Sequence, residues 1–124
     1  MFDFLRITFF IINFAQKYQM EIIFDKEYLK ELFFEGKTND KKHRFQPEVI
    51  KGYQKAVLMI ASAKCVEDLY TYHSLNYEVL VGDKKGISSV RCNRKYRLEF
   101  LVNSSDANTF IKICTLFDIT NHYK

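Results

Sequence analysis

The chain has 124 residues, of which 48% are hydrophobic and 27% charged, with 4 Gly and 1 Pro. This length fits one domain, the apolar content excludes intrinsic disorder, and the scarcity of Gly and Pro excludes collagen-like and linker-rich architectures. The formal net charge is +4, and residues 84–97 alone hold six Lys or Arg and no Asp or Glu. Such a local excess fits a polyanionic partner and equally fits a solvated surface, so charge alone leaves both open.

The N-terminal segment, residues 1–19, contains an apolar run at residues 7–12. This run is much shorter than the roughly 18 residues of a membrane span, and no small-residue cleavage site follows it. One hypothesis is a surface-lying amphipathic helix. The hypothesis that we favour is an extension upstream of a translation start at Met20, which predicts a domain over residues 20–124.

The domain is predicted to begin with one strand and one helix. Residues 21–24 are short and β-branched, which is typical of a strand. We expect Asp25 to cap a helix over residues 26–35, because its side-chain oxygen can accept from the first backbone N–H groups. Gly36 suits the left-handed position that ends a helix.

A second helix is predicted after the polar and basic loop at residues 37–44. Pro47 suits its first turn, where the missing N–H has no partner in any case. The apolar positions that follow recur at helical spacing and predict a buried face: Val49, Ile50, Tyr53, Ala56, Val57 and Ile60. Residues 66–70 predict one further helical turn.

After residue 74 the apolar period changes from helical to alternating. The predicted strands are residues 76–81, 87–92, 96–102 and 110–117, with turn residues between them. An N-terminal strand, two to three helices and then a strand meander predict an α+β fold. Its helices would pack on one face of a mostly antiparallel sheet of four to five strands.

The hairpin around Asn93 has a register that keeps its two faces chemically consistent. A three-residue loop at residues 93–95 pairs Arg91 with Arg97 and Val90 with Leu98. Apolar residues then share one face and both arginines the other, whereas a two-residue loop mixes charge into the apolar face.

Two opposed guanidinium groups repel each other, so the pairing of Arg91 with Arg97 predicts a shared anion such as phosphate. The alternative is that Glu99, on the same face, neutralises both arginines in an ordinary surface ion network. Spacing alone does not decide between these two interpretations.

Metal and cofactor sites are not predicted. The three cysteines and three histidines are scattered and lack the spacing of a ligand cluster. His43 and His73 fall in loops and are assigned no catalytic role, and the tyrosines and phenylalanines are expected to fill the core.

Four motifs in order carry a family resemblance: Gly82-Asp83-Lys84-Lys85-Gly86, Ser88-Ser89-Val90-Arg91, Tyr96-Arg97-Leu98-Glu99-Phe100 and Thr120-Asn121-His122-Tyr123. Together they resemble the RelE/ParE toxin superfamily, and within it the HigB branch of plasmid-maintenance killer proteins. The resemblance covers residues 20–124 and implies a RelE-like fold.

The resemblance further implies a cytoplasmic toxin of a type II toxin-antitoxin system, with no membrane partner. Such a toxin is a ribosome-dependent mRNA endonuclease that needs no metal or other cofactor and cleaves by attack of a ribose 2′-OH on the adjacent phosphate. A small HigA-like helix-turn-helix antitoxin would silence it and repress the operon.

The matched motifs assign the chemistry to Arg97 and His122, and Arg91 lies beside Arg97 in the predicted register. Well-known HigB members read H-P-L-K where this chain has Glu78-Val79-Leu80-Val81. The general base is therefore open, with Tyr77, Glu78 and Asn121 as auxiliary candidates. Four further cations are expected to hold the RNA backbone: Lys84, Lys85, Arg94 and Lys95.

Two other functions remain in competition. A toxin resembling the ParE branch would poison DNA gyrase by protein contact without hydrolysis. An inactive relative would act as an antitoxin ligand and co-repressor, an alternative that the missing histidine and lysine of H-P-L-K leave open. The terminal histidine and the paired arginines favour the nuclease.

Overall fold

The computed structural model describes residues 6–8, 20–104 and 112–121. Its strands and helices follow the chain in this order: β1 (Arg6–Thr8), β2 (Met20–Phe24), α1 (Glu27–Glu35), α2 (Pro47–Ser62), α3 (Val66–Thr71), β3 (Glu78–Val79), β4 (Ser88–Arg91), β5 (Arg97–Ser104) and β6 (Lys112–Thr120). Short 3₁₀ turns lie at Lys41–His43, His73–Leu75 and Gly82–Lys84. The predicted α+β class is confirmed.

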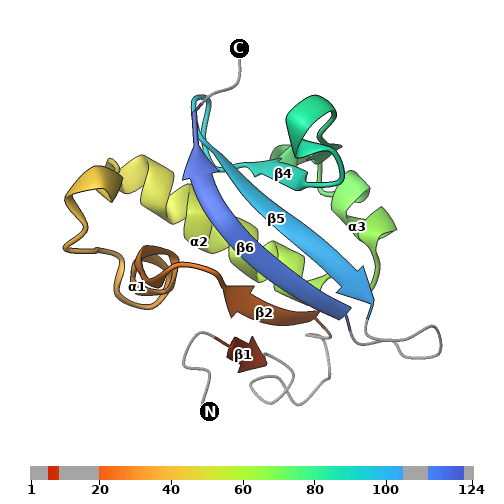
Figure 1. The fold of residues 1–124 in the computed structure, drawn as a ribbon, viewed down its shortest axis with the longest axis horizontal. Helices are drawn as coiled ribbons and strands as arrows, with labels where there is room; N and C mark the ends of the chain where they lie inside the picture. Colours follow the sequence, from red (N-terminus) through yellow and green to blue (C-terminus); the bar gives the residue numbers. More distant parts are fainter. Residues whose placement is uncertain (1–5, 9–19, 105–111, 122–124) are drawn as a thin grey trace.

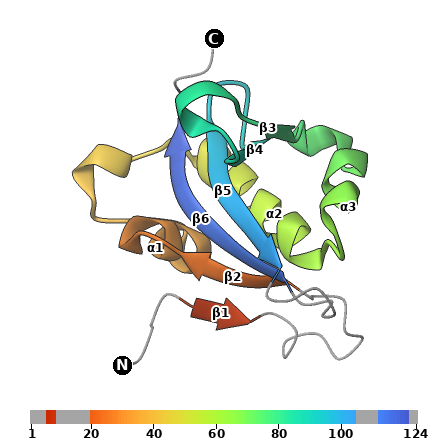
Figure 2. The same ribbon diagram turned by 45° about the vertical axis from the view of Figure 1, so that its right-hand side comes forward.

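The six strands form one sheet in the order β1-β2-β6-β5-β4-β3. Strands β2 and β6 run parallel, and the other neighbours are antiparallel. In Figure 1, β5 and β6 lie in front of α2, and Figure 2 places α3 beside β3 and β4. The helices thus cover one face of the sheet, as predicted.

Strand β1 differs from the surface helix that was one hypothesis for residues 1–19. Arg6–Thr8 pairs antiparallel with β2, with Ile7 opposite Ile22. The hypothesis of a surface helix is therefore wrong for these residues, and the sheet has a sixth strand. Ile7 and Thr8 are both β-branched, which favours a strand over a helix.

Helix α1 begins one residue later than predicted. Lys26 takes the N-cap position and makes no side-chain capping bond, so the capping role expected of Asp25 is wrong. The backbone N–H of Asp25 donates to Leu116 O at 2.9 Å, which ties this residue to strand β6 rather than to the helix. Gly36 ends α1 with φ 74°, as predicted.

The strands after residue 74 differ from prediction mainly in length. Strand β3 has 2 residues, because Asn76 has φ 49° before it and a turn follows at Gly82–Lys84. Strand β6 reaches Thr120, and its register with β5 shifts between Glu99 and Phe100. This bulge hides the alternating pattern beyond Leu116, which is why the sequence indicated an earlier end.

The core lies between α2 and the covered face of the sheet. Tyr53, Val57 and Ile60 are fully buried and pack with sheet residues such as Leu98 and Phe100. The Tyr53 hydroxyl donates to Leu29 O at 2.7 Å, which joins α2 to α1. The predicted buried face of the second helix is confirmed, except that Ile50 is only partly buried.

None of the helices within the described ranges combines the length and the apolarity that crossing a membrane requires.

Helix α2 approaches the β4–β5 hairpin so closely that one position requires glycine. A Cβ at Gly52 would overlap the backbone carbonyl of Cys92. Because the neighbour is backbone rather than a flexible side chain, it cannot move aside without moving the hairpin.

We therefore predict that Gly52→Ala lowers the free energy of unfolding by about 1 to 3 kcal/mol through overpacking. In a helix free of this contact, the same change would add about 1 kcal/mol. Urea denaturation measures the difference. Lys51→Ala, at the exposed neighbouring position of α2, is the control and is expected to change stability by less than about 0.5 kcal/mol. A Gly52→Ala protein more stable than the wild type would contradict the close contact.

Candidate functional site

The face of the sheet opposite the helices is polar and arranged in two rows. One row runs across four strands through Glu78, Ser89, Glu99 and Asp118. The next row runs through Arg91, Arg97 and Thr120. A row of carboxylates therefore lies beside a row that carries two guanidinium groups.

The predicted hairpin register is confirmed. Arg91 lies opposite Arg97, Val90 lies opposite Leu98, and the Cys92 N–H donates to Tyr96 O at 2.9 Å. Asn93 holds the loop, because its Oδ1 accepts from the N–H groups of Lys95 at 2.9 Å and Tyr96 at 2.7 Å. An asparagine that binds its own turn in this way is a recurrent hairpin feature.

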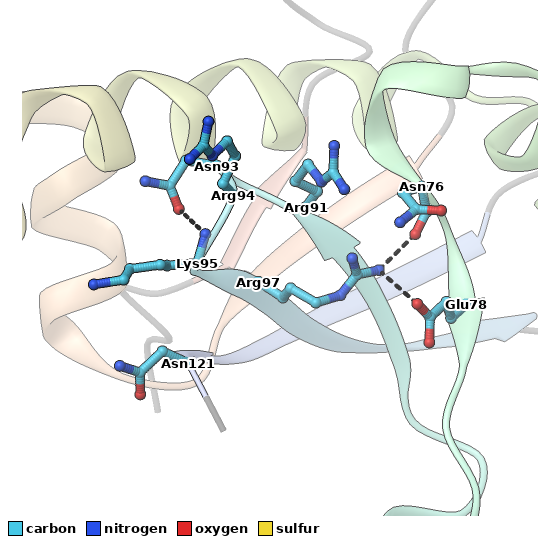
Figure 3. A pocket seen from close by; sticks show the side chains of 8 residues that line it. All are labelled: Asn76, Glu78, Arg91, Asn93, Arg94, Lys95, Arg97 and Asn121. Atoms are coloured by element: carbon cyan, nitrogen blue, oxygen red, sulfur yellow. Dashed lines mark hydrogen bonds and ion pairs between the residues drawn. The ribbon is translucent and has the colours of Figure 1, made fainter. Parts of the chain in front are cut away.

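A pocket of about 450 Å³ opens on this face beside the hairpin, and we call it the basic pocket. Its lining consists of four cationic side chains, one carboxylate and three amides: Arg91, Arg94, Lys95, Arg97, Glu78, Asn76, Asn93 and Asn121 (Figure 3). The excess of positive charge suits a phosphate group.

Arg97 is the fixed cation of the basic pocket and is 7% exposed. Its Nε donates to Ser89 Oγ at 2.5 Å, and its Nη2 donates to Asn76 O at 2.5 Å and to Ser89 O at 3.2 Å. Glu78 Oε2 lies 3.7 Å from the same Nη2. These contacts hold the guanidinium in one orientation, as Figure 3 shows for Asn76 and Glu78.

A carboxylate lies close to the guanidinium group of Arg97. One carboxylate within ion-pair distance of Arg97 is Glu78 on the edge strand β3, at 3.7 Å. The sequence did not indicate this contact, because it depends on how β3 pairs with β4. Glu99, the neutralising residue that the sequence suggested, accepts a hydrogen bond from Lys84 Nζ at 2.8 Å.

A family model described as the RelE-like toxin of the type II toxin-antitoxin system HigB matches residues 22–113. The chain belongs to the HigB-like toxin family. It is a toxin of a type II toxin-antitoxin system, as its motifs predicted.

One similar solved structure is a YoeB/ParE toxin from Agrobacterium tumefaciens. It is 13% identical, with a TM-score of 0.49, and the match covers 82% of this chain and 98% of that chain. A comparison with curated protein sequences gives no significant match.

Three cations of this HigB-like toxin surround Arg97 and are exposed: Arg91, Arg94 and Lys95. Within the described ranges, no hydrogen bond or ion pair engages their side chains. The basic pocket thus combines one orientated guanidinium with three cations that are available to a ligand.

The other predicted site residues lie in different places. Glu78 and Asn121 line the basic pocket (Figure 3). Tyr77 packs on the helix side of the sheet, where its hydroxyl is 2.8 Å from Ser88 Oγ and its ring lies edge-on to Tyr70. Burial raises the pKa of Tyr77, and the structure does not bring it to the pocket. His122 lies outside the described residues.

Sequence reasoning missed Asn76 and Asn93 as pocket residues. Asn76 contributes its backbone carbonyl to Arg97, a role that side-chain chemistry cannot signal. For Asn93, its place in the predicted hairpin loop, next to both arginines, was the signal that could have identified it as a pocket residue. Among the residues that the structure describes, no group of three or more His, Cys, Asp or Glu is placed to hold a metal ion.

The two lysines of the predicted backbone-binding set differ in their contacts. Lys84 forms an ion pair at 2.8 Å with Glu99, whose side chain is 8% exposed. Lys85 is exposed. Lys84 therefore holds the turn at Gly82–Lys84 against the polar face, whereas Lys85 remains available to a polyanion.

We predict that Lys84→Ala lowers the free energy of unfolding by about 1 to 2 kcal/mol, because it takes the lysine from a buried carboxylate. Lys85→Ala is the matched control and is expected to change stability by less than about 0.5 kcal/mol. Urea denaturation of the two variants measures both values. Equal stability of the two would show that the ion pair is only a surface contact.

Proposed function

We propose that this toxin is a ribosome-dependent endoribonuclease that cleaves mRNA without a metal ion. The observation that carries the proposal is the basic pocket, in which the orientated Arg97 lies among three available cations. Cleavage within an RNA chain needs a cation placed where charge develops on the phosphate. A guanidinium held by its neighbours meets this need without reorganising during the reaction.

The proposed reaction begins with attack of a ribose 2′-oxygen on the adjacent phosphorus. The bond between phosphorus and the 5′-oxygen breaks, which leaves a 2′,3′-cyclic phosphate and a 5′-hydroxyl. Arg97 and Arg91 stabilise the charge on the phosphate oxygens. A base takes the 2′-OH proton, and an acid protonates the leaving 5′-oxygen.

Glu78 is the residue that we propose as the base. Its side chain is 50% exposed, lines the basic pocket and lies 3.7 Å from Arg97. It also begins the segment that stands in place of the H-P-L-K of other HigB toxins. We assign the acid to His122 on the family resemblance, and Asn121 is proposed to orient the attacking hydroxyl.

The partners follow from the toxin class and from the pocket. A type II toxin has an antitoxin, and we propose that this one is a HigA-like helix-turn-helix protein encoded beside the toxin. We further propose that the toxin acts in the cytoplasm on mRNA held by the ribosome. Arg94, Lys95 and Lys85 are then expected to contact the RNA backbone.

Induction of the toxin without its antitoxin is expected to arrest growth and to produce discrete mRNA cuts within translated frames. Primer extension after brief induction detects these cuts. DNA damage with intact mRNA would instead support a gyrase-poisoning toxin. Harmless expression with neither effect would support an inactive co-repressor.

The central test of the mechanism is the arginine pair. Arg97→Ala is expected to reduce single-turnover cleavage of ribosome-bound mRNA by about 10² to 10³, the cost of one lost charge stabiliser. Because Arg97 is buried, Arg91→Ala provides a second test at an exposed position and is expected to lower the rate without a change in unfolding. Lys51→Ala, on the exposed side of α2, is the control. Full activity of both arginine variants would exclude the pocket as the site of cleavage.

Glu78→Gln separates proton transfer from binding. It is expected to lower the single-turnover rate by about 10² to 10⁴, whereas RNA affinity stays equal or increases because a negative charge leaves the pocket. His122→Ala is expected to lower the rate over the same range. If Glu78→Gln retains the wild-type rate while His122→Ala is inactive, the base is not Glu78.

A further inference from the structure

A second pocket, of about 390 Å³, lies next to the basic pocket, and Asn121 lines both. Its lining includes His43, Phe45, Tyr96, Asp118 and Thr120. We call it the aromatic pocket. Thr120 is the cross-strand partner of Arg97, so the two pockets are neighbours at the end of the sheet where β5 begins and β6 ends.

Aromatic rings from two separate segments meet in this pocket. Phe45 lies edge-on to Tyr96, with ring centroids 5.2 Å apart and an angle of 74°. His43 lies 6.1 Å from Phe45 and stacks on Tyr28 at 3.5 Å. Phe45 and Tyr96 are only partly buried, so they offer ring surface to a ligand. Single-stranded RNA is bound in this way elsewhere, by cations that hold the backbone and aromatic rings that stack on bases.

Asp118 gives the aromatic pocket an orientated hydrogen-bond acceptor. Its Oδ1 accepts from the Tyr28 hydroxyl and from the Ile119 N–H at 3.1 Å. No described residue donates a hydrogen bond to Oδ2, and the side chain is 40% exposed. The carboxylate therefore has one oxygen fixed by its neighbours and one available to a ligand.

Tyr28 is well suited to fix this carboxylate. Burial, followed by the bond to Asp118, raises the pKa of Tyr28 well above its usual range. The hydroxyl therefore stays protonated and remains a donor to Asp118. Its ring is in turn held by the parallel stack with His43.

We propose that the aromatic pocket binds a base of the RNA whose phosphate occupies the basic pocket, and that Asp118 selects bases that carry an exocyclic amino group. This inference rests on the proposed function. A carboxylate accepts hydrogen bonds but donates none, so it favours the amino groups of adenine, cytosine and guanine. Uracil has no amino group, and its ring N–H lies between two carbonyl oxygens that a carboxylate repels. Two lysines also line this pocket. Lys84 is bound by Glu99, and Lys42 is exposed.

Three short RNAs that differ in one base test the selection, with 2′-O-methyl groups to prevent cleavage. The variable base is adenine, unsubstituted purine or hypoxanthine. Purine lacks the amino group of adenine, and hypoxanthine has a carbonyl group in its place. The wild-type toxin is expected to bind the adenine RNA about tenfold more tightly than the purine RNA, the effect of one hydrogen bond to a charged group. The hypoxanthine RNA is expected to bind most weakly. Fluorescence anisotropy measures the three affinities.

Asp118→Asn is the decisive variant because it keeps the size of the side chain. The donors Tyr28 and Ile119 should hold the amide oxygen where Oδ1 lies, which places the amide NH₂ group where Oδ2 lies. The available group then donates instead of accepting, so hypoxanthine is expected to bind more tightly than adenine. Arg91→Ala is the control and should weaken binding of all three RNAs by the same factor.

The outcomes separate the inference from the proposed function. Equal affinities of the wild type for the three RNAs, together with normal mRNA cleavage, would overturn the base pocket and leave the nuclease intact. Base selection that reverses in Asp118→Asn, without any mRNA cleavage, would support the pocket and overturn the nuclease. Tyr96→Leu tests the stacking surface and is expected to weaken every RNA by about tenfold; an unchanged affinity would contradict stacking. Absence of RNA binding in the wild type would overturn the inference directly.

Discussion

A guanidinium group buried in the polar face of a sheet is the constraint on which the site depends. Removing a charge from water is costly unless hydrogen bonds and an opposite charge replace the solvent. Arg97 obtains them from Ser89 on β4, the carbonyl of Asn76 and the carboxylate of Glu78 on β3. The short edge strand, the hairpin and the turn before β3 are thereby tied to one side chain. The same contacts give the basic pocket a cation that is already orientated.

One face of the sheet packs into the hydrophobic core, and the opposite face carries the polar residues of the candidate site. Leu98 and Phe100 pack against the helices, while Arg97 and Glu99 alternate with them on the opposite face. Helix α2 stabilises the covered face and reaches the hairpin where Gly52 meets the Cys92 backbone. The geometry of the basic pocket therefore depends on packing that lies on the other side of the sheet.

Pairing decides which charged groups of the polar face remain available. Lys84 is engaged by Glu99 and Arg97 by Glu78, whereas Arg91, Arg94 and Lys95 are exposed around the pocket. Asp118 also has an engaged and an available group. The Tyr28 hydroxyl binds one carboxylate oxygen, and no described residue donates a hydrogen bond to the other. A run of charges in the sequence thus becomes a set of groups with separate roles.

Local patterns in the sequence were sufficient for the α+β class, the end of α1 at Gly36, the start of α2 at Pro47 and the pairing of Arg91 with Arg97. The class follows from the order of the elements, and the other three rest on neighbours within one turn, one helix or one hairpin. The contacts of Arg97 with Glu78, of Lys84 with Glu99 and of Tyr28 with Asp118 required the tertiary structure. These pairs join separate elements, up to 90 residues apart for Tyr28 and Asp118, and depend on strand order and on the bulge in β6. Periodicity assigns a side chain to a face, but only the packing of strands from distant segments decides which charges meet there.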